Sequence, residues 1–105
     1  MISIEYYSLF LKGDPAKISK MKNLIREDLR KTEIAFFKAD SEKDFKSMRS
    51  ELHKISPIIF NLKYKEFLSL IEQYKAYDQY SDELKNLNEQ LKQYLVQVYI
   101  FLEEI

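Results

Sequence analysis

Apolar residues recur every three or four positions through most of the chain. This spacing is typical of helices that bury one face and leave the other in water. It is clearest between residues 44 and 62, where a continuous apolar stripe consists of Phe45, Met48, Leu52, Ile55, Ile59 and Leu62. The same rhythm predicts further helices over residues 2–11, 15–38, 64–77 and 81–103.

Short polar links separate these predicted helices. In residues 12–15 a glycine suits a helix end, Asp14 can cap the next helix, and a proline takes its first position. Ser41 is predicted to cap the helix over 44–62, with Asp44 three residues later completing a capping box. Short links favour antiparallel neighbours. We therefore predict an all-α fold, an antiparallel up-down-up-down four-helix bundle with a short additional N-terminal helix, as a single domain over residues 1–105.

Pro57 lies inside the helix predicted over 44–62. Because proline has no amide hydrogen, the carbonyl of His53 loses its usual helical partner. Two outcomes are open: a kink within one helix, or a break in which Ser56 caps a new helix that starts at Pro57. The apolar spacing continues unbroken to Leu62, which favours the kink.

The only histidine of the chain, His53, lies on this same helix. At about 100° per residue, it lies roughly 130° from the centre of the apolar stripe, so its ring is expected to face solvent. Arg49 and Lys46 lie one and two turns before it on the same side, and Ser56 lies one turn after it. The expected surroundings of the imidazole are therefore polar and cationic.

The residues around His53 resemble the phosphorylatable helix of histidine-containing phosphotransfer (HPt) domains. That family typically shows a histidine, one further residue, a leucine, a lysine and a glycine, then a hydrophobic–glycine pair about two turns on. The histidine and the two hydrophobic positions are matched in this sequence by His53, Ile55 and Leu62. The family lysine and the two glycines are replaced by Ser56, Pro57 and Lys63.

The resemblance implies a function in a phosphorelay. An HPt domain accepts a phosphoryl group on its histidine from the aspartyl phosphate of a receiver domain and passes it to another receiver. The implied partners are response-regulator receiver domains and a hybrid histidine kinase. The receiver supplies the Mg²⁺, so the chain is expected to need no cofactor of its own.

Composition limits the other possibilities. The 105 residues carry a formal net charge of zero with no basic block, so a nucleic-acid partner is not expected. With one histidine and no cysteine, no metal site is predicted. No signal peptide opens the chain, and the most apolar tract, residues 94–102, is too short to span a bilayer. We expect a cytoplasmic protein with no membrane partner, and a monomer is favoured.

Phosphoryl transfer to His53 needs nearby positive charge, because charge on the equatorial phosphoryl oxygens must be stabilised. Arg49 and Ser56 are predicted to share the role of the family lysine, with Lys46 or Lys54 in reserve. The competing interpretation of these charges is a solvated helix face.

Partner docking is assigned to Ser50, Pro57 and Phe60, which share the His53 side of the predicted helix. An exposed aromatic side chain beside a reactive residue can anchor a partner. For Phe60 the alternative is that the kink at Pro57 turns its ring into the core.

Three function classes remain. The first is an HPt phosphoryl carrier, which is not a turnover enzyme. The second is a phosphorylation-incompetent helical-bundle scaffold or receiver-binding module, in which His53 is an ordinary surface histidine. The third is an autonomous enzyme, against which the absence of an acid–base pair around His53 argues.

Overall fold

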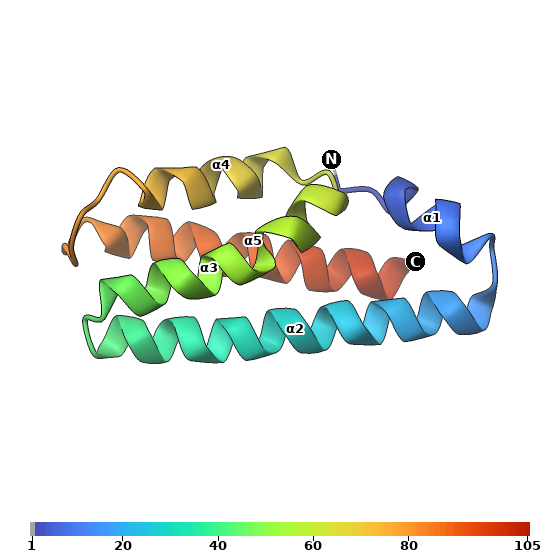
Figure 1. The fold of residues 1–105 in the computed structure, drawn as a ribbon, viewed down its shortest axis with the longest axis horizontal. Coiled ribbons are helices and arrows are strands. Elements are labelled where there is room, and N and C mark those ends of the chain that lie inside the picture. Colours follow the sequence, from blue (N-terminus) through green and yellow to red (C-terminus); the bar gives the residue numbers. More distant parts are fainter. Residues whose placement is uncertain (1) are drawn as a thin grey trace.

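The computed structural model describes residues 2–105, with the side chains of all of these but Phe10. This range contains helices and no strand, which confirms the all-helical prediction. The predicted span from residue 1 includes Met1, which lies outside the described residues. The helices, shown in Figure 1, are α1 (Glu5–Leu11), α2 (Pro15–Ser41), α3 (Phe45–Asn61), α4 (Lys65–Tyr74) and α5 (Leu84–Glu104).

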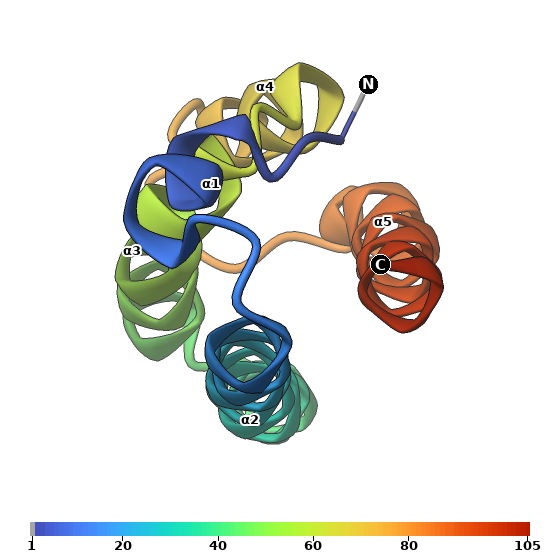
Figure 2. The ribbon, with the colours of Figure 1, turned by 90° about the vertical axis from the view of Figure 1, so that its right-hand side faces the viewer.

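The four longer helices pack in a ring. α2 contacts α3, α3 contacts α4, α4 contacts α5, and α5 returns to α2. Figure 2 shows this arrangement from one end, with α1 lying over the end of α3. In Figure 1 the chain reverses direction at each connection between α2 and α5. The molecule is elongated, with extents of 45 × 22 × 19 Å.

The apolar stripe predicted from the spacing lies in the core. All six of its residues between Phe45 and Leu62 are at most 6% exposed. They pack with buried residues of the other long helices, among them Leu29, Phe67 and Leu91. Burial of this face holds α3 rigidly and leaves the opposite face free for a site.

A buried polar chain joins three helices at the end where α2 stops. The Tyr74 hydroxyl donates to Asn88 Oδ1 at 2.6 Å, and Asn88 Nδ2 donates to Asp40 Oδ1 at 3.0 Å. Burial raises the pKa of Tyr74, and the nearby Asp40 charge raises it further, because both disfavour a phenolate. These bonds fix the position of α4 relative to α2 and α5.

The predicted cap of α3 is wrong. Ser41 is the last residue of α2, and its hydroxyl donates back to the Lys38 carbonyl at 2.6 Å. Asp44 is the cap instead: its carboxylate accepts from the Ser47 amide at 3.1 Å and from the Ser47 hydroxyl at 2.7 Å. α2 runs three residues beyond its predicted end, and the chain then reverses through Lys43 at φ 55°.

α3 continues through Pro57 as one helix, so the alternative of a new helix starting there is wrong. Its ribbon bends in the last turns (Figure 1). The Ser56 hydroxyl donates back to the Leu52 carbonyl at 3.1 Å instead of capping. α4 is shorter than predicted because the amides of residues 75–77 donate to carbonyls three residues back, which tightens and ends the helix.

In the part of the chain that the structure describes, no helix is both long enough and apolar enough to cross a membrane.

Candidate functional site

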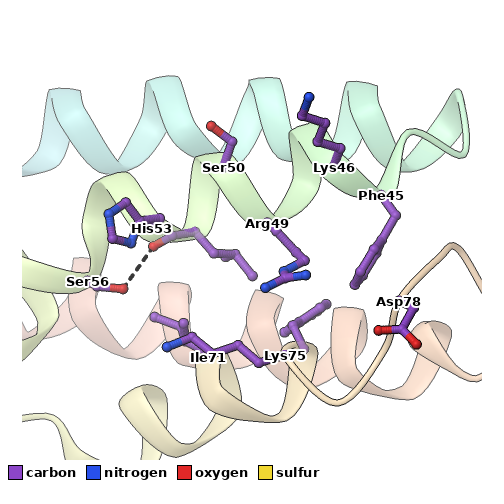
Figure 3. Close-up of a pocket in the computed structure, with 11 residues that line it drawn as sticks. Phe45, Lys46, Arg49, Ser50, His53, Ser56, Ile71, Lys75 and Asp78 are labelled. Atoms are coloured by element: carbon purple, nitrogen blue, oxygen red, sulfur yellow. Dashed lines mark hydrogen bonds between the residues drawn. The ribbon is translucent and has the colours of Figure 1, made fainter.

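A groove of about 510 Å³ lies between α3 and α4. Its walls combine buried apolar residues at the base with charged residues at the rim (Figure 3). It is lined by Phe45, Lys46, Arg49, Ser50, Leu52, His53, Ser56, Ile71, Tyr74, Lys75 and Asp78. Five of these residues were singled out from the sequence as site candidates: Lys46, Arg49, Ser50, His53 and Ser56.

His53 is exposed, as predicted from its position on the helix. Its neighbours Leu52 and Ile55 are each 2% exposed, so they anchor this turn of α3 in the core. The imidazole is therefore carried on a fixed backbone and remains accessible at the groove. His53 and Ser56 lie at one end of the groove, and Phe45 and Asp78 lie at the other (Figure 3).

Arg49 lies one turn before His53 and projects between α3 and α4 (Figure 3). Its guanidinium carbon lies 5.8 Å from the centroid of the Phe45 ring. Among the described residues, no carboxylate forms an ion pair with it. Residues one turn apart on a helix are about 5–6 Å apart at Cβ, so a group on the imidazole is within reach of this guanidinium.

The other predicted phosphate neighbours differ in their availability. Ser56 is half-buried, and its hydroxyl proton is engaged by the Leu52 carbonyl. Lys46 lines the groove but points away from α4 (Figure 3). Lys54 does not line the groove, and its ammonium pairs with Glu51 at 2.7 Å. Arg49 is therefore the predicted neighbour best placed to meet an anion at His53.

The candidate docking residues are separated in space. Ser50 lines the groove, although in Figure 3 it points away from α4. Pro57 and Phe60 are exposed but lie outside the groove lining. Phe60 is 67% exposed, so the alternative that the bend carries its ring into the core is wrong.

The sequence interpretation missed the α4 side of the groove. Lys75 follows the last residue of α4, and Asp78 lies in the connection to α5. Ile71 and Tyr74 form the apolar part of this wall. The signal for Lys75 was its place one turn after Ile71. Its presence in the same groove as Arg49 depends on the position of α4 along α3, which spacing within one helix does not define.

This arrangement suits the binding of an anion beside a nucleophile. It offers an accessible imidazole, a guanidinium without an ion-pair partner among the described residues, and from the opposite wall an ammonium in an exposed pair with Glu72. The carboxylate of Asp78 lies at the far end. In the described residues, no three side chains of histidine, cysteine, aspartate or glutamate gather as metal ligands would.

Comparison with known proteins adds no relative: no protein-family model matches the sequence, and no curated protein or solved structure is significantly similar to it. Functional interpretation therefore depends on the site itself and on the few residues around His53.

Proposed function

We propose that this chain is a histidine phosphotransfer protein, built as an up-down-up-down four-helix bundle with α1 added at one end. In this proposal His53 accepts a phosphoryl group from the aspartyl phosphate of a receiver domain and passes it to a second receiver. The protein is a carrier and not a turnover enzyme. Its partners are response-regulator receivers and a hybrid histidine kinase in the cytoplasm.

One observation carries the proposal: an exposed imidazole stands on the outer face of α3, one turn from an arginine that has no ion-pair partner among the described residues. A carrier histidine must be reachable by the active site of another protein. It must also keep its position when that protein docks, which burial of Leu52 and Ile55 provides.

The transfer step is a direct displacement at phosphorus. The lone pair of the unprotonated ring nitrogen of a neutral His53 attacks, a new N–P bond forms, and the P–O bond to the receiver's aspartate breaks. The aspartate leaves as a carboxylate, and the proton on the other ring nitrogen stays or is lost to water. The reverse sequence loads the second receiver, so no redox partner and no cofactor of this chain are needed.

Charge stabilisation in this proposal falls mainly to Arg49. A guanidinium is always charged and presents several donors to phosphoryl oxygens. Ser56 has a secondary role, since its hydroxyl oxygen is near His53 but its proton is used by the Leu52 carbonyl. Lys46 contributes at longer range from the groove rim.

The alternative is a bundle that binds a receiver without accepting phosphate. It is favoured by the loss of the family lysine: Ser56 occupies that position, and the adjacent Lys54 is paired with Glu51 at 2.7 Å. In that case Phe60, exposed one turn beyond Pro57, would anchor the partner through apolar contact.

A labelled-transfer assay separates the two functions. Receivers from the same genome are loaded with labelled aspartyl phosphate and mixed with this protein, and acid-labile, base-stable label is followed on the chain. The carrier function predicts transfer in the wild type and none in His53→Gln. Binding of a receiver without any transfer would instead support the scaffold.

A further inference from the structure

The wall of the groove opposite His53 carries a second cation. Lys75 is the residue that follows α4, whereas His53 and Arg49 belong to α3, and all three line the same groove. Figure 3 shows the side chains of Arg49 and Lys75 entering the space between the two helices from opposite sides. Each wall of the groove therefore carries a cation, and His53 lies at one end of the same groove.

The direction of the Lys75 side chain brings its ammonium toward the histidine. Side chains on a helix lean toward its N-terminus, and Lys75 Nζ contacts Glu72 Oε1, one turn back, at 2.8 Å. α3 and α4 run in opposite directions (Figure 1). A side chain that points toward the N-terminus of α4 therefore points toward the C-terminus of α3, which is the direction from Arg49 to His53. Figure 3 agrees, with the Lys75 chain extending toward Ile71.

The present partner of Lys75 is easily exchanged. In the Lys75–Glu72 pair the side chains are 55% and 67% exposed. Ion pairs this exposed contribute little to stability because water screens them. A phosphoryl group carries up to two negative charges, so it competes well with a single carboxylate for the ammonium.

We infer that Lys75 is a further phosphate-binding residue, which leaves Glu72 and closes on the phosphoryl group of phosphorylated His53 from the α4 wall. This inference rests on the proposed phosphorylation of His53. The charged and polar side chains in or beside the groove are Arg49, Lys46 and Ser56 on α3, Lys75 at the end of α4 with its partner Glu72, and Asp78 at the far end.

Lys54 provides a matched control. It also pairs with a glutamate three residues earlier, at 2.7 Å, and its side chain is 63% exposed. It is adjacent to His53 in sequence but lies outside the groove lining. Lys75→Gln and Lys54→Gln remove the same charge and break an ion pair of the same spacing. The two pairs differ in the exposure of the glutamate, 67% for Glu72 and 16% for Glu51, and in their position relative to the groove.

The test uses phosphoramidate, which can load the histidine without any receiver: its N–P bond breaks, ammonia leaves, and the N–P bond to the imidazole forms. The phosphohistidine signal is then titrated by phosphorus NMR in the wild type and both variants. A neighbouring cation favours the dianion, so Lys75→Gln should raise the titration midpoint by roughly 0.5 pH unit. Lys54→Gln should change it by less than about 0.1 unit.

Equal shifts in the two variants, or no shift in Lys75→Gln, would overturn the inference. Failure of phosphoramidate to modify His53 would also overturn it, because the accessible imidazole is its premise. If the midpoint shifts only in Lys75→Gln while no receiver transfers phosphate, the role of Lys75 stands and the relay function fails.

Discussion

Two arginines of this molecule have the same aromatic contact and different ionic surroundings. Arg30 on α2 and Arg49 on α3 each lie 5.8 Å from a ring centroid, that of Tyr99 and that of Phe45 respectively. Arg30 also meets Glu33 at 3.5 Å, and the Tyr99 hydroxyl donates to the same carboxylate at 3.0 Å. Arg49 forms no ion pair within the described chain.

The difference separates a structural charge from an available one. Between α2 and α5, the positive charge is balanced by a neighbouring carboxylate, and the contact joins the two helices. Between α3 and α4, the guanidinium is held in place by an aromatic ring and left with its donors directed at a groove that also contains His53. Unbalanced charge beside a nucleophile is what recognition of a phosphoryl group requires.

The largest expected effect separates the two faces of α3 itself. His53→Gln should abolish phosphoryl transfer, yet change the free energy of unfolding by less than about 0.5 kcal/mol, because the side chain is exposed. Leu52→Ala, one residue away and 2% exposed, should destabilise the protein by about 2–5 kcal/mol. Urea unfolding and label transfer measure the two effects. Appreciable transfer in His53→Gln would contradict the assignment.

The second prediction compares the two arginines directly. Arg49→Ala should slow transfer to His53 about tenfold, which corresponds to about 1.4 kcal/mol in the barrier. Arg30→Ala should leave the transfer rate within about twofold of the wild type, since its guanidinium serves the α2–α5 contact. Single-turnover kinetics with a loaded receiver measure both. Equal slowing in the two variants would remove the distinction between the arginines.

The third prediction concerns the buried polar chain behind the groove. Tyr74→Phe removes the donor to Asn88 Oδ1 and should destabilise the protein by about 1–2 kcal/mol at neutral pH. Thermal or urea unfolding at neutral pH measures this loss. A stability unchanged from the wild type would show that the bond does not hold α4.

The same variant should behave differently in alkali. Because burial raises the pKa of Tyr74 in the folded state, its contribution is fully present below the unfolded tyrosine pKa of about 10 and is lost as pH rises above it. The stability of Tyr74→Phe should therefore fall less steeply above about pH 10 than that of the wild type. Unfolding followed across this pH range tests the sign, and parallel curves would contradict it.

The smallest expected effect concerns the partner of Lys75. Glu72→Gln frees the ammonium from its exposed ion pair, so transfer to His53 should speed up about twofold. Glu51→Gln, which removes the same charge and frees Lys54 outside the groove, is the control and should leave the transfer rate unchanged. Transfer rates of both variants are measured with the same loaded receiver. An equal gain in rate would mean that the change in net charge, and not the release of Lys75, causes the effect.

Sequence reasoning succeeded where helix geometry alone decides the result. The buried stripe from Phe45 to Leu62 and the exposure of His53 follow from 3.6 residues per turn, and both are confirmed. The prediction of Ser41 as the cap of α3 was wrong. Ser41 and Asp44 can both cap a helix, and the choice between them depends on where α2 ends, which the local sequence does not define. Sequence reasoning missed Lys75 and Asp78 because their places in the groove depend on packing between helices.

The most direct test of the account follows the ring of His53 while a receiver loaded with aspartyl phosphate is added. As the only histidine, its ring protons can be observed by NMR without assignment of the rest of the chain. If His53 accepts the phosphoryl group, these signals shift and a phosphorus–proton coupling to the imidazole appears, and Arg49→Ala shows the same change more slowly. Receivers that bind and lose their phosphate to water, with the imidazole signals uncoupled, would contradict the account.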